Sequence, residues 1–243
     1  MQKVSCIIPM YNEAPRISWV LQVLTQIKNI WEIICVDDAS SDNSIQIVQK
    51  KFPTVKIVKH TTNQWKTQAV KTWVQASSYD SIFLCDADLE WLLTNEVQQA
   101  IQIFFQKNAD MVILKRENAP LHIKAFRWHV LITWERILKK YDINQILHRQ
   151  YLWFELEMEI NKYMMNKEKK CIRMPSAATN TFKTQKYGLI QGIKKDLEMY
   201  TQMKVIENKF LQQIISFHIE CWLDKPGIID KLIEQFEFID DQS

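Results

Sequence analysis

The sequence predicts an α/β fold, in which a mostly parallel, Rossmann-like sheet is flanked by helices and followed by a mainly helical C-terminal part. Three observations support this prediction. Short apolar runs alternate with amphipathic helical segments over about the first 115 residues. The runs are apolar at consecutive positions, which is typical of strands buried on both faces of a parallel sheet. Helical periodicity dominates the rest of the chain.

Five apolar runs are predicted as strands because each has the length of a buried strand. They lie at residues 4–9, 32–38, 55–58, 81–85 and 110–114. After the first run, apolar residues recur at the spacing of an amphipathic helix, at Ile17, Val20, Leu21, Leu24 and Ile27. Similar helices are expected over residues 45–52, 66–76 and 97–105, with caps from Asp42, Asn43, Ser44 and Thr94.

The second half of the chain is predicted to hold helices over residues 126–140, 154–166 and 189–203 and a short strand over residues 171–174. The chain has 243 residues, 47% of them hydrophobic, which is enough for a sizeable core. Because no linker, repeat or low-complexity stretch interrupts it, we expect a single domain over residues 1–243. Its last part, residues 206–243, is expected to be a helical tail.

Composition excludes several classes of protein. A net charge of +3 is too small to indicate a nucleic-acid partner. No apolar run approaches the roughly 18 residues that span a bilayer, and the first residues do not resemble a secretory signal. The five cysteines are scattered singly, which indicates a reducing compartment rather than a disulfide or zinc framework. We therefore expect a cytoplasmic protein.

Acidic residues follow three of the predicted strands, as Glu13, as Asp37 and Asp38, and as Asp86 and Asp88. Ligands of an open parallel sheet bind at the carboxyl ends of its strands. Carboxylates gathered there need a compensating charge, and their oxygen atoms suit Mg²⁺ or Mn²⁺. Such an ion would neutralise a diphosphate leaving group. The alternative is that the aspartates only cap helices or form turns.

Other nucleotide-binding classes fit the sequence less well. An aspartate after the second strand is also typical of dinucleotide-dependent dehydrogenases, but no Gly-x-Gly-x-x-Gly follows the first strand. Nucleotidyltransferases share the sheet type and the acidic metal ligands. They carry a glycine-rich, basic loop after the first strand, however, and MYNEAPR is not such a loop.

Three stretches, IIPMYNEAPRI, VDDASSDNS and LCDADLE, resemble in order and spacing the motifs of glycosyltransferase family 2, which has the GT-A fold. The resemblance covers about residues 3–205 and is strongest to dolichyl- or polyprenyl-phosphate mannose synthase-like members. It implies a metal-dependent hexosyltransferase that uses GDP- or UDP-hexose in glycan or cell-envelope synthesis, with polyprenyl phosphate as the expected acceptor. It also implies a nucleotide-sugar half, residues 1–115, and an acceptor half, residues 116–205.

By this resemblance, the metal is expected to be held by Asp86, Asp88 and Glu90, with Asp88 as the more direct ligand. Asn180 stands where many relatives have a histidine that joins the metal site. Lys66 belongs to a stretch that is glycine-rich in relatives and is expected to meet a phosphate. The residues expected to line the nucleotide-sugar pocket are Pro9, Tyr11, Asn12, Glu13, Asp37, Asp38, Lys66 and Asp86.

Two further segments carry the resemblance into the acceptor half. LITWERIL resembles the family's Ser-Gly-x-Arg segment, which implies that Arg136 lies near the sugar or the acceptor phosphate, a ligand that arginine binds well. LWFELEMEI resembles a segment on the acceptor side, so Glu155 and Glu157 are candidates for a general base. The alternatives are a surface salt bridge for Arg136 and a solvated helix face for the two glutamates.

A lipid acceptor implies peripheral contact with the inner face of the membrane. The segment over residues 126–141 is amphipathic, and Lys124, Arg127, Lys139 and Lys140 accompany it, as in helices that lie on anionic surfaces. The alternative is a helix packed on the sheet. Two other readings of the function stay open, namely a transferase with a soluble small-molecule acceptor and a degenerate, non-catalytic nucleotide-binding module.

The chain has 3 glycines and 9 tryptophans, although average usage predicts about 17 glycines. We hypothesise that some positions written as tryptophan are encoded by UGA, and that the source organism reads this codon as glycine. The alternative is a diverged enzyme with genuine tryptophans. Relatives have glycine at four of the positions, and often at a fifth: Trp65, Trp73, Trp134, Trp153 and Trp19. The sequence leaves Trp31, Trp91, Trp128 and Trp222 undecided.

Overall fold

The computed structural model describes residues 2–62, 65–117, 133–147 and 155–180. The chain divides into two units, residues 1–197 and 198–243. The second unit lies outside the described residues, as do the helices expected over residues 189–203 and 206–243. No helix of the described ranges is both long enough and apolar enough to cross a membrane.

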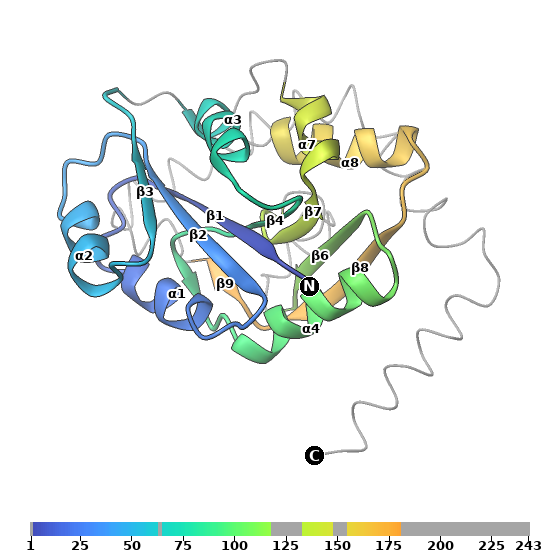
Figure 1. The fold of residues 1–243 in the computed structure, drawn as a ribbon, viewed down its shortest axis with the longest axis horizontal. Helices are drawn as coiled ribbons and strands as arrows, with labels where there is room; N and C mark the ends of the chain where they lie inside the picture. Colours follow the sequence, from blue (N-terminus) through green and yellow to red (C-terminus); the bar gives the residue numbers. More distant parts are fainter. Residues whose placement is uncertain (1, 63–64, 118–132, 148–154, 181–243) are drawn as a thin grey trace, which may run out of the picture. The chain divides into compact units, whose positions relative to one another are not determined.

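A seven-stranded sheet forms the centre of the first unit, with the strand order β3-β2-β1-β4-β7-β6-β8 (Figure 1). β7 runs antiparallel to both of its neighbours, and the other pairings are parallel. The predicted mostly parallel α/β fold is therefore confirmed. The strands are β1 (Val4–Met10), β2 (Ile30–Asp37), β3 (Lys56–Lys59), β4 (Ser81–Leu84), β6 (Met111–Arg116), β7 (Arg136–Lys139) and β8 (Cys171–Ser176).

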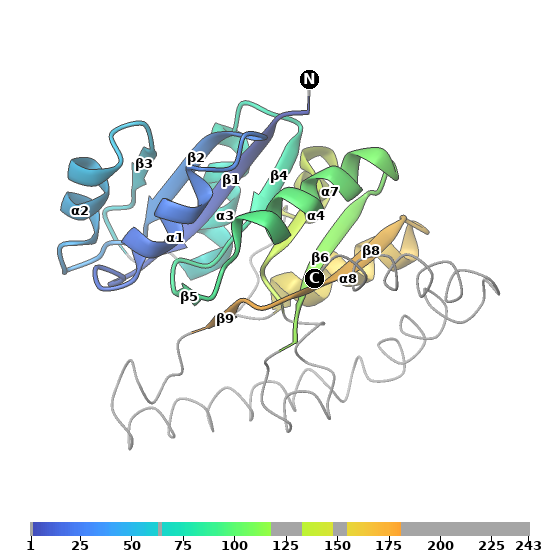
Figure 2. The same cartoon turned by 90° about the horizontal axis from the view of Figure 1, so that it is seen from below.

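Helices cover both faces of this sheet. One face carries α1 (Ile17–Leu24), α2 (Ser44–Lys51) and α4 (Thr94–Gln106), as Figure 2 shows. The other carries α3 (Trp65–Ala76), α7 (Lys140–Ile146) and α8 (Glu155–Asn166) (Figure 1). Neighbouring residues of β1 show why the strands are apolar throughout, because Ile8 packs into the first core and Ile7 into the second, and both are fully buried.

The expected helix over residues 126–140 is wrong in its last part, where β7 forms instead. Ile137 and Leu138 of this strand are both fully buried, one in each core. A short run that is apolar on both faces fits a central strand as well as a buried helix, so its periodicity does not separate the two. Residues 126–132 of the expected helix lie outside the described residues.

A second, two-stranded sheet was not predicted. β5 (Leu89–Glu90) pairs antiparallel with β9 (Thr179–Asn180), with Leu89 opposite Asn180. Strands of two residues are too short to produce a periodic pattern. This pairing joins the segment after β4 to a segment about ninety residues later in the chain, and it positions the candidate site.

Candidate active site

Asp86 and Asp88 lie in the short segment between β4 and β5, at the carboxyl end of a central strand. Asn180 of β9 joins them, because its amide nitrogen Nδ2 donates to Asp86 Oδ2 and to Asp88 Oδ1, at 3.0 Å each. Asp88 is buried and Asp86 is half-buried. The structure therefore brings together the two aspartates and the asparagine that the sequence placed about ninety residues apart.

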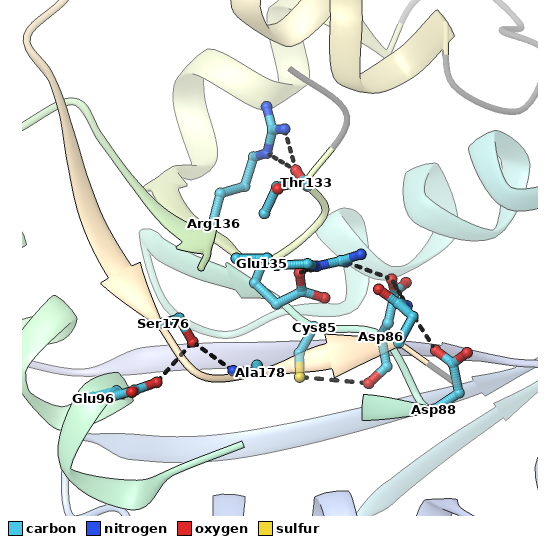
Figure 3. Close-up of polar contacts among 11 residues, drawn as sticks. Cys85, Asp86, Asp88, Glu96, Thr133, Glu135, Arg136, Ser176 and Ala178 are labelled. Atoms are coloured by element: carbon cyan, nitrogen blue, oxygen red, sulfur yellow. Dashed lines mark hydrogen bonds and ion pairs between the residues drawn. The ribbon is translucent and has the colours of Figure 1, made fainter. Parts of the chain in front are cut away.

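An ion pair between half-buried Arg116 and fully buried Glu135 lies beside these aspartates. Arg116, the last residue of β6, donates from Nη2 and Nε to Glu135 Oε2 at 2.6 Å and 3.1 Å. The same Nη2 lies 3.5 Å from Asp86 Oδ2, so one guanidinium links Glu135 to the aspartates. Figure 3 shows Glu135 on the side of the chain that faces Asp86, whereas the neighbouring Arg136 points the opposite way.

The electrostatics of this pair follow from its burial. Burial raises the pKa of Glu135, and the positive charge of Arg116 offsets only part of that rise. For Arg116, burial alone would lower the pKa, but the carboxylates of Glu135 and Asp86 raise it above its ordinary value. Arg116 therefore stays charged and provides a fixed cation at the carboxyl edge of the sheet.

The oxygen atoms of this site fit a hard divalent cation. The aspartates supply carboxylate oxygens, and Asn180 Oδ1 is a buried oxygen without a hydrogen-bond partner in the described part of the chain. Within the same residues, no three side chains of the His, Cys, Asp and Glu types gather to hold a metal ion, so exposed Glu90 does not complete a trio. Mg²⁺ commonly takes one or two protein carboxylates and completes its shell with substrate phosphates and water.

The loops that follow β1 and β2 interlock. The backbone N–H of Asn12 donates to Ser40 Oγ at 2.9 Å, and Asn12 Oδ1 accepts from the N–H of Ser41 at 2.8 Å. In the same way, the backbone N–H of Glu13 donates to Ser44 Oγ at 2.9 Å. Asn12 has a φ of 56°, a conformation that asparagine tolerates better than most residues. These contacts join residues 12–13 to residues 40–44, and the two loops together form one wall beside Asp37 and Asp38.

Asp37 and Asp38 play different parts in this wall. Asp37 is fully buried, and its Oδ2 accepts from the backbone N–H of Ser40 at 3.1 Å, so it stabilises the turn after β2. Asp38 Oδ1 lies 3.0 Å from Nδ1 of the buried His60. Pro9 is half-buried in β1, and Tyr11 is exposed at the end of that strand. The predicted pocket residues of β1 and β2 therefore share one edge of the sheet.

Arg136 lies at this edge, opposite Leu84 of β4, but its side chain points away from Asp86 (Figure 3). Arg136 is fully buried on the α8 side of the sheet, where Nη1 donates to Asn161 Oδ1 at 3.0 Å and Nε to Thr133 O at 3.0 Å. Glu157 of α8 is also buried, so neither the surface salt bridge nor the solvated helix face describes these residues. Both were predicted to be catalytic, and the structure places them in the second core. The side chains of Lys66 and Glu155 lie outside the described residues.

The sequence prediction missed Arg116, Glu135 and His60. Arg116 follows the fifth predicted strand, residues 110–114, by two positions, so the rule that ligands bind at carboxyl ends could have identified it. Glu135 lies next to the arginine that was named instead. No sequence signal marked His60, because a single histidine after a strand has no distinctive spacing.

Comparison with known proteins gives a consistent result. The family model described as glycosyl transferase family 2 matches residues 5–171. A dolichyl-phosphate beta-glucosyltransferase of Trichomonas vaginalis is 31% identical over 152 residues, which are 52% of this chain and 45% of that protein. A poly(ribitol-phosphate) beta-glucosyltransferase of Bacillus spizizenii is 42% identical over 67 residues, which are 25% of this chain and 11% of that protein. The chain thus spans less than half the length of either relative.

Solved structures of similar fold include two enzyme groups crystallised with Mn²⁺ and nucleotides. Glucosyl-3-phosphoglycerate synthase of Mycobacterium tuberculosis, in complex with Mn²⁺, UDP and glucosyl-3-phosphoglycerate, has a TM-score of 0.61 at 13% identity. The match covers 74% of this chain and 72% of that chain. A mannosyltransferase of Pyrobaculum calidifontis with GDP-Man and Mn²⁺ has a TM-score of 0.57 at 18% identity and covers 72% and 55%. At these identities the likeness concerns the fold.

Proposed function

Because the chain belongs to glycosyl transferase family 2 and has the GT-A fold, we propose that it transfers a hexose from a nucleoside diphosphate sugar to polyprenyl phosphate. The observation that carries this proposal is the group formed by Asp86, Asp88, Asn180 and Arg116 at the carboxyl edge of the sheet. It combines oxygen ligands for a cation with a fixed guanidinium, which is the complement that a diphosphate needs.

The donor is bound in two parts. The wall built by Asn12, Ser40 and Asp38 receives the nucleoside, and the diphosphate lies toward Asp88 and Arg116. A Mg²⁺ or Mn²⁺ ion bound there supplies charge neutralisation for the diphosphate as it leaves. Arg116 holds the same phosphates through charged hydrogen bonds from a guanidinium that Glu135 keeps in place.

The transfer itself breaks one bond and forms one. An oxygen atom of the acceptor phosphate attacks the anomeric carbon, the bond from that carbon to the diphosphate oxygen breaks, and nucleoside diphosphate leaves with the bonding electrons. An ionised phosphate needs no general base. Asp88 is the proposed catalytic residue because its carboxylate would hold the divalent ion that neutralises the leaving diphosphate. Arg116 replaces Arg136 in the proposed site.

The acceptor and the setting rest on a relative rather than on the geometry. The Trichomonas protein of similar sequence is a dolichyl-phosphate glucosyltransferase, which supports a lipid phosphate as acceptor, glycan or cell-envelope assembly as purpose, and peripheral contact with a membrane. Two lysines of the expected membrane-binding segment are engaged elsewhere. Lys139 Nζ lies 2.6 Å from Asp110 Oδ1, and Lys140 Nζ donates to Ser77 O at 2.6 Å. Lys124, Arg127 and residues 126–132 of that segment lie outside the described residues, so contact of this segment with a membrane stays a prediction.

Product analysis tests this function. The full chain is incubated with UDP-glucose or GDP-mannose, Mn²⁺ or Mg²⁺, and either polyprenyl phosphate in detergent or a soluble phosphorylated acid. The proposal predicts release of nucleoside diphosphate and hexose in the lipid fraction, both lost in Asp88→Asn. Hexose in the aqueous product would support a soluble acceptor. If the chain shows neither turnover nor metal-dependent nucleotide binding, the proposal is wrong and the interpretation as a degenerate, non-catalytic module is supported.

We also propose that some of the tryptophans are glycines encoded by UGA, and two structural observations support this. Trp91 has a φ of 58°, a left-handed conformation that glycine adopts without cost and a bulky side chain does not. Trp73 is fully buried, and its indole N–H has no hydrogen-bond partner among the residues that the structure describes. Reading the codons of the gene tests the proposal, since UGG codons for Trp65, Trp73, Trp134 and Trp153 would disprove it.

A further inference from the structure

The amide nitrogen of Asn180 lies between one carboxylate oxygen of Asp86 and one of Asp88. Nδ2 lies 3.0 Å from Asp86 Oδ2 and 3.0 Å from Asp88 Oδ1. An amide nitrogen only donates hydrogen bonds and cannot ligate a metal ion. In this arrangement Asn180 therefore substitutes for a cation, because it brings positive hydrogen atoms to both carboxylates. The arrangement also competes with any cation that binds them.

The other end of the same amide is unsatisfied. Asn180 Oδ1 is buried and accepts no hydrogen bond from the described residues. A buried polar atom without a partner costs roughly 1–3 kcal/mol, so a stable native structure usually has a reason for it. Rotating the amide by 180° exchanges the two ends and places this oxygen next to the aspartates. Next to two carboxylates this oxygen is favourable only if a cation is bound between the three groups.

The strand pairing of β9 holds the backbone of Asn180 in place, so its amide can rotate without moving the chain. β9 pairs with β5, which follows Asp88 directly. The strand before it is anchored by Glu96 of α4, whose carboxylate accepts from Ser176 Oγ at 2.7 Å and from the backbone N–H of Ala177 at 3.0 Å (Figure 3 shows Glu96 and Ser176). The amide therefore turns over a fixed Cα, and the change involves little more than one side-chain torsion.

We propose that Asn180 is a two-position ligand, whose nitrogen bridges Asp86 and Asp88 in the metal-free protein and whose oxygen faces the cation in the loaded protein. This inference rests on the proposed function, because it concerns the same metal site. It assigns the site an all-oxygen donor set, and oxygen donors suit Mg²⁺ and Mn²⁺ rather than softer ions. It also implies weak binding of the cation alone, because Arg116 neutralises part of the aspartate charge and the amide bridge must be broken first.

Cation binding is consequently expected to depend on nucleotide. A diphosphate adds negative oxygen atoms and engages Arg116, so it removes one competitor for the carboxylates. Thermodynamic linkage requires the effect to be reciprocal. If UDP or GDP increases the affinity for Mn²⁺ by some factor, Mn²⁺ must increase the affinity for that nucleotide by the same factor. Measuring both affinities, each with and without the other ligand, gives this coupling directly.

Three variants test the role of the amide, with Mn²⁺ binding followed by the electron paramagnetic resonance signal of the free ion. We expect Asn180→Ala to weaken Mn²⁺ binding in the presence of UDP or GDP on the order of tenfold. Asn180→Asp adds a charged oxygen at the same place, so it should bind Mn²⁺ more tightly than the wild type and melt at a lower temperature without metal. Asn180→His should shift preference toward Co²⁺ and Zn²⁺, since imidazole suits these ions. Gln106→Glu, an exposed change of the same charge at the end of α4, serves as control and should bind Mn²⁺ like the wild type.

The outcomes separate the inference from the function that it rests on. If Asn180→Ala binds Mn²⁺ as tightly as the wild type or more tightly, the amide acts only as a metal-free bridge and the two-position proposal is wrong. The proposed metal-dependent function survives that result. If instead the wild type binds no Mn²⁺ with either nucleotide, the function fails and the inference fails with it.

Discussion

Glu135 Oε2 lies 2.6 Å from Nη2 of Arg116, and this contact fixes the direction of a guanidinium that also reaches Asp86. The carboxylate is fully buried, whereas the guanidinium end approaches the carboxyl edge of the sheet. Glu135 is thus a positioning residue, and it acts on the site through Arg116.

Loss of Arg116 should weaken nucleotide binding. We expect Arg116→Gln to raise the Kd for UDP or GDP with Mn²⁺ on the order of tenfold to a hundredfold, since a hydrogen bond to a charged group contributes roughly 1.5–3 kcal/mol. Titration calorimetry measures this. Lys115→Gln removes the same charge from the neighbouring residue, which pairs with Glu117 at 2.9 Å, and should change the Kd little. An equal effect of both variants would indicate a long-range electrostatic effect of positive charge instead of a direct contact between Arg116 and the nucleotide.

Glu135→Gln should show a different pattern. The amide keeps the shape of the side chain but loses the charge that holds Arg116, so we expect a higher KM for the nucleotide sugar with a smaller change in kcat. Arg116→Lys, which keeps the charge and loses the fork, should resemble it. A variant that unfolds below the assay temperature would instead mark Glu135 as purely structural, which a melting curve detects.

Arg136 should contribute to stability and not to binding. Burial lowers the pKa of Arg136 to about 10, and the carboxylate of Glu157 opposes that shift. Arg136→Met removes the donors to Asn161 and Thr133, so we expect the free energy of unfolding to fall by about 2–4 kcal/mol. Urea unfolding measures this loss. An unchanged stability with a tenfold weaker acceptor affinity would restore the role predicted from the sequence.

Glu32 should make folding sensitive to acid. Burial alone would raise the pKa of Glu32, but hydrogen bonds from Lys56, Ser78 and Ser5 lower it to about 2. Because the folded pKa lies below the unfolded value of about 4.3, the stabilisation is complete above the unfolded value and disappears as the pH falls toward 2. We expect roughly 2 kcal/mol of stability to be lost over that range in the wild type, and this loss should be absent in Glu32→Gln. Urea midpoints between pH 2 and pH 6 measure the difference.

Two exposed tryptophans offer a matched test of the glycine hypothesis. Trp91→Gly should raise the free energy of unfolding by about 0.5–1 kcal/mol, because it relieves the left-handed backbone at φ 58°. Trp31 lies in β2, and Lys3 Nζ sits 4.0 Å from its ring. Trp31→Gly should therefore lower stability by about 1–2 kcal/mol through the lost contact and the flexible strand residue. Destabilisation by both changes would count against glycine at position 91.

The sequence by itself determined the order of the elements, the α/β class and the edge at which Asp86 and Asp88 lie. These features follow from local patterns, because a strand buried on both faces needs a continuous apolar run and polar residues must follow it where the strand meets solvent. The same local reasoning correctly grouped the loop of Asn12 with that of Asp38. Both loops follow parallel strands, and parallel strands end at one edge.

Only the tertiary structure decided which distant residues complete the site. Asn180 reaches the aspartates through a two-residue strand pair, Glu135 rather than Arg136 faces the site, and β7 is a strand where helical periodicity was expected. Neighbouring residues of an extended chain point to opposite sides, so a shift of one position exchanges a site residue for a core residue. Pattern alone does not set that register, because it depends on how β7 pairs with β4 and β6.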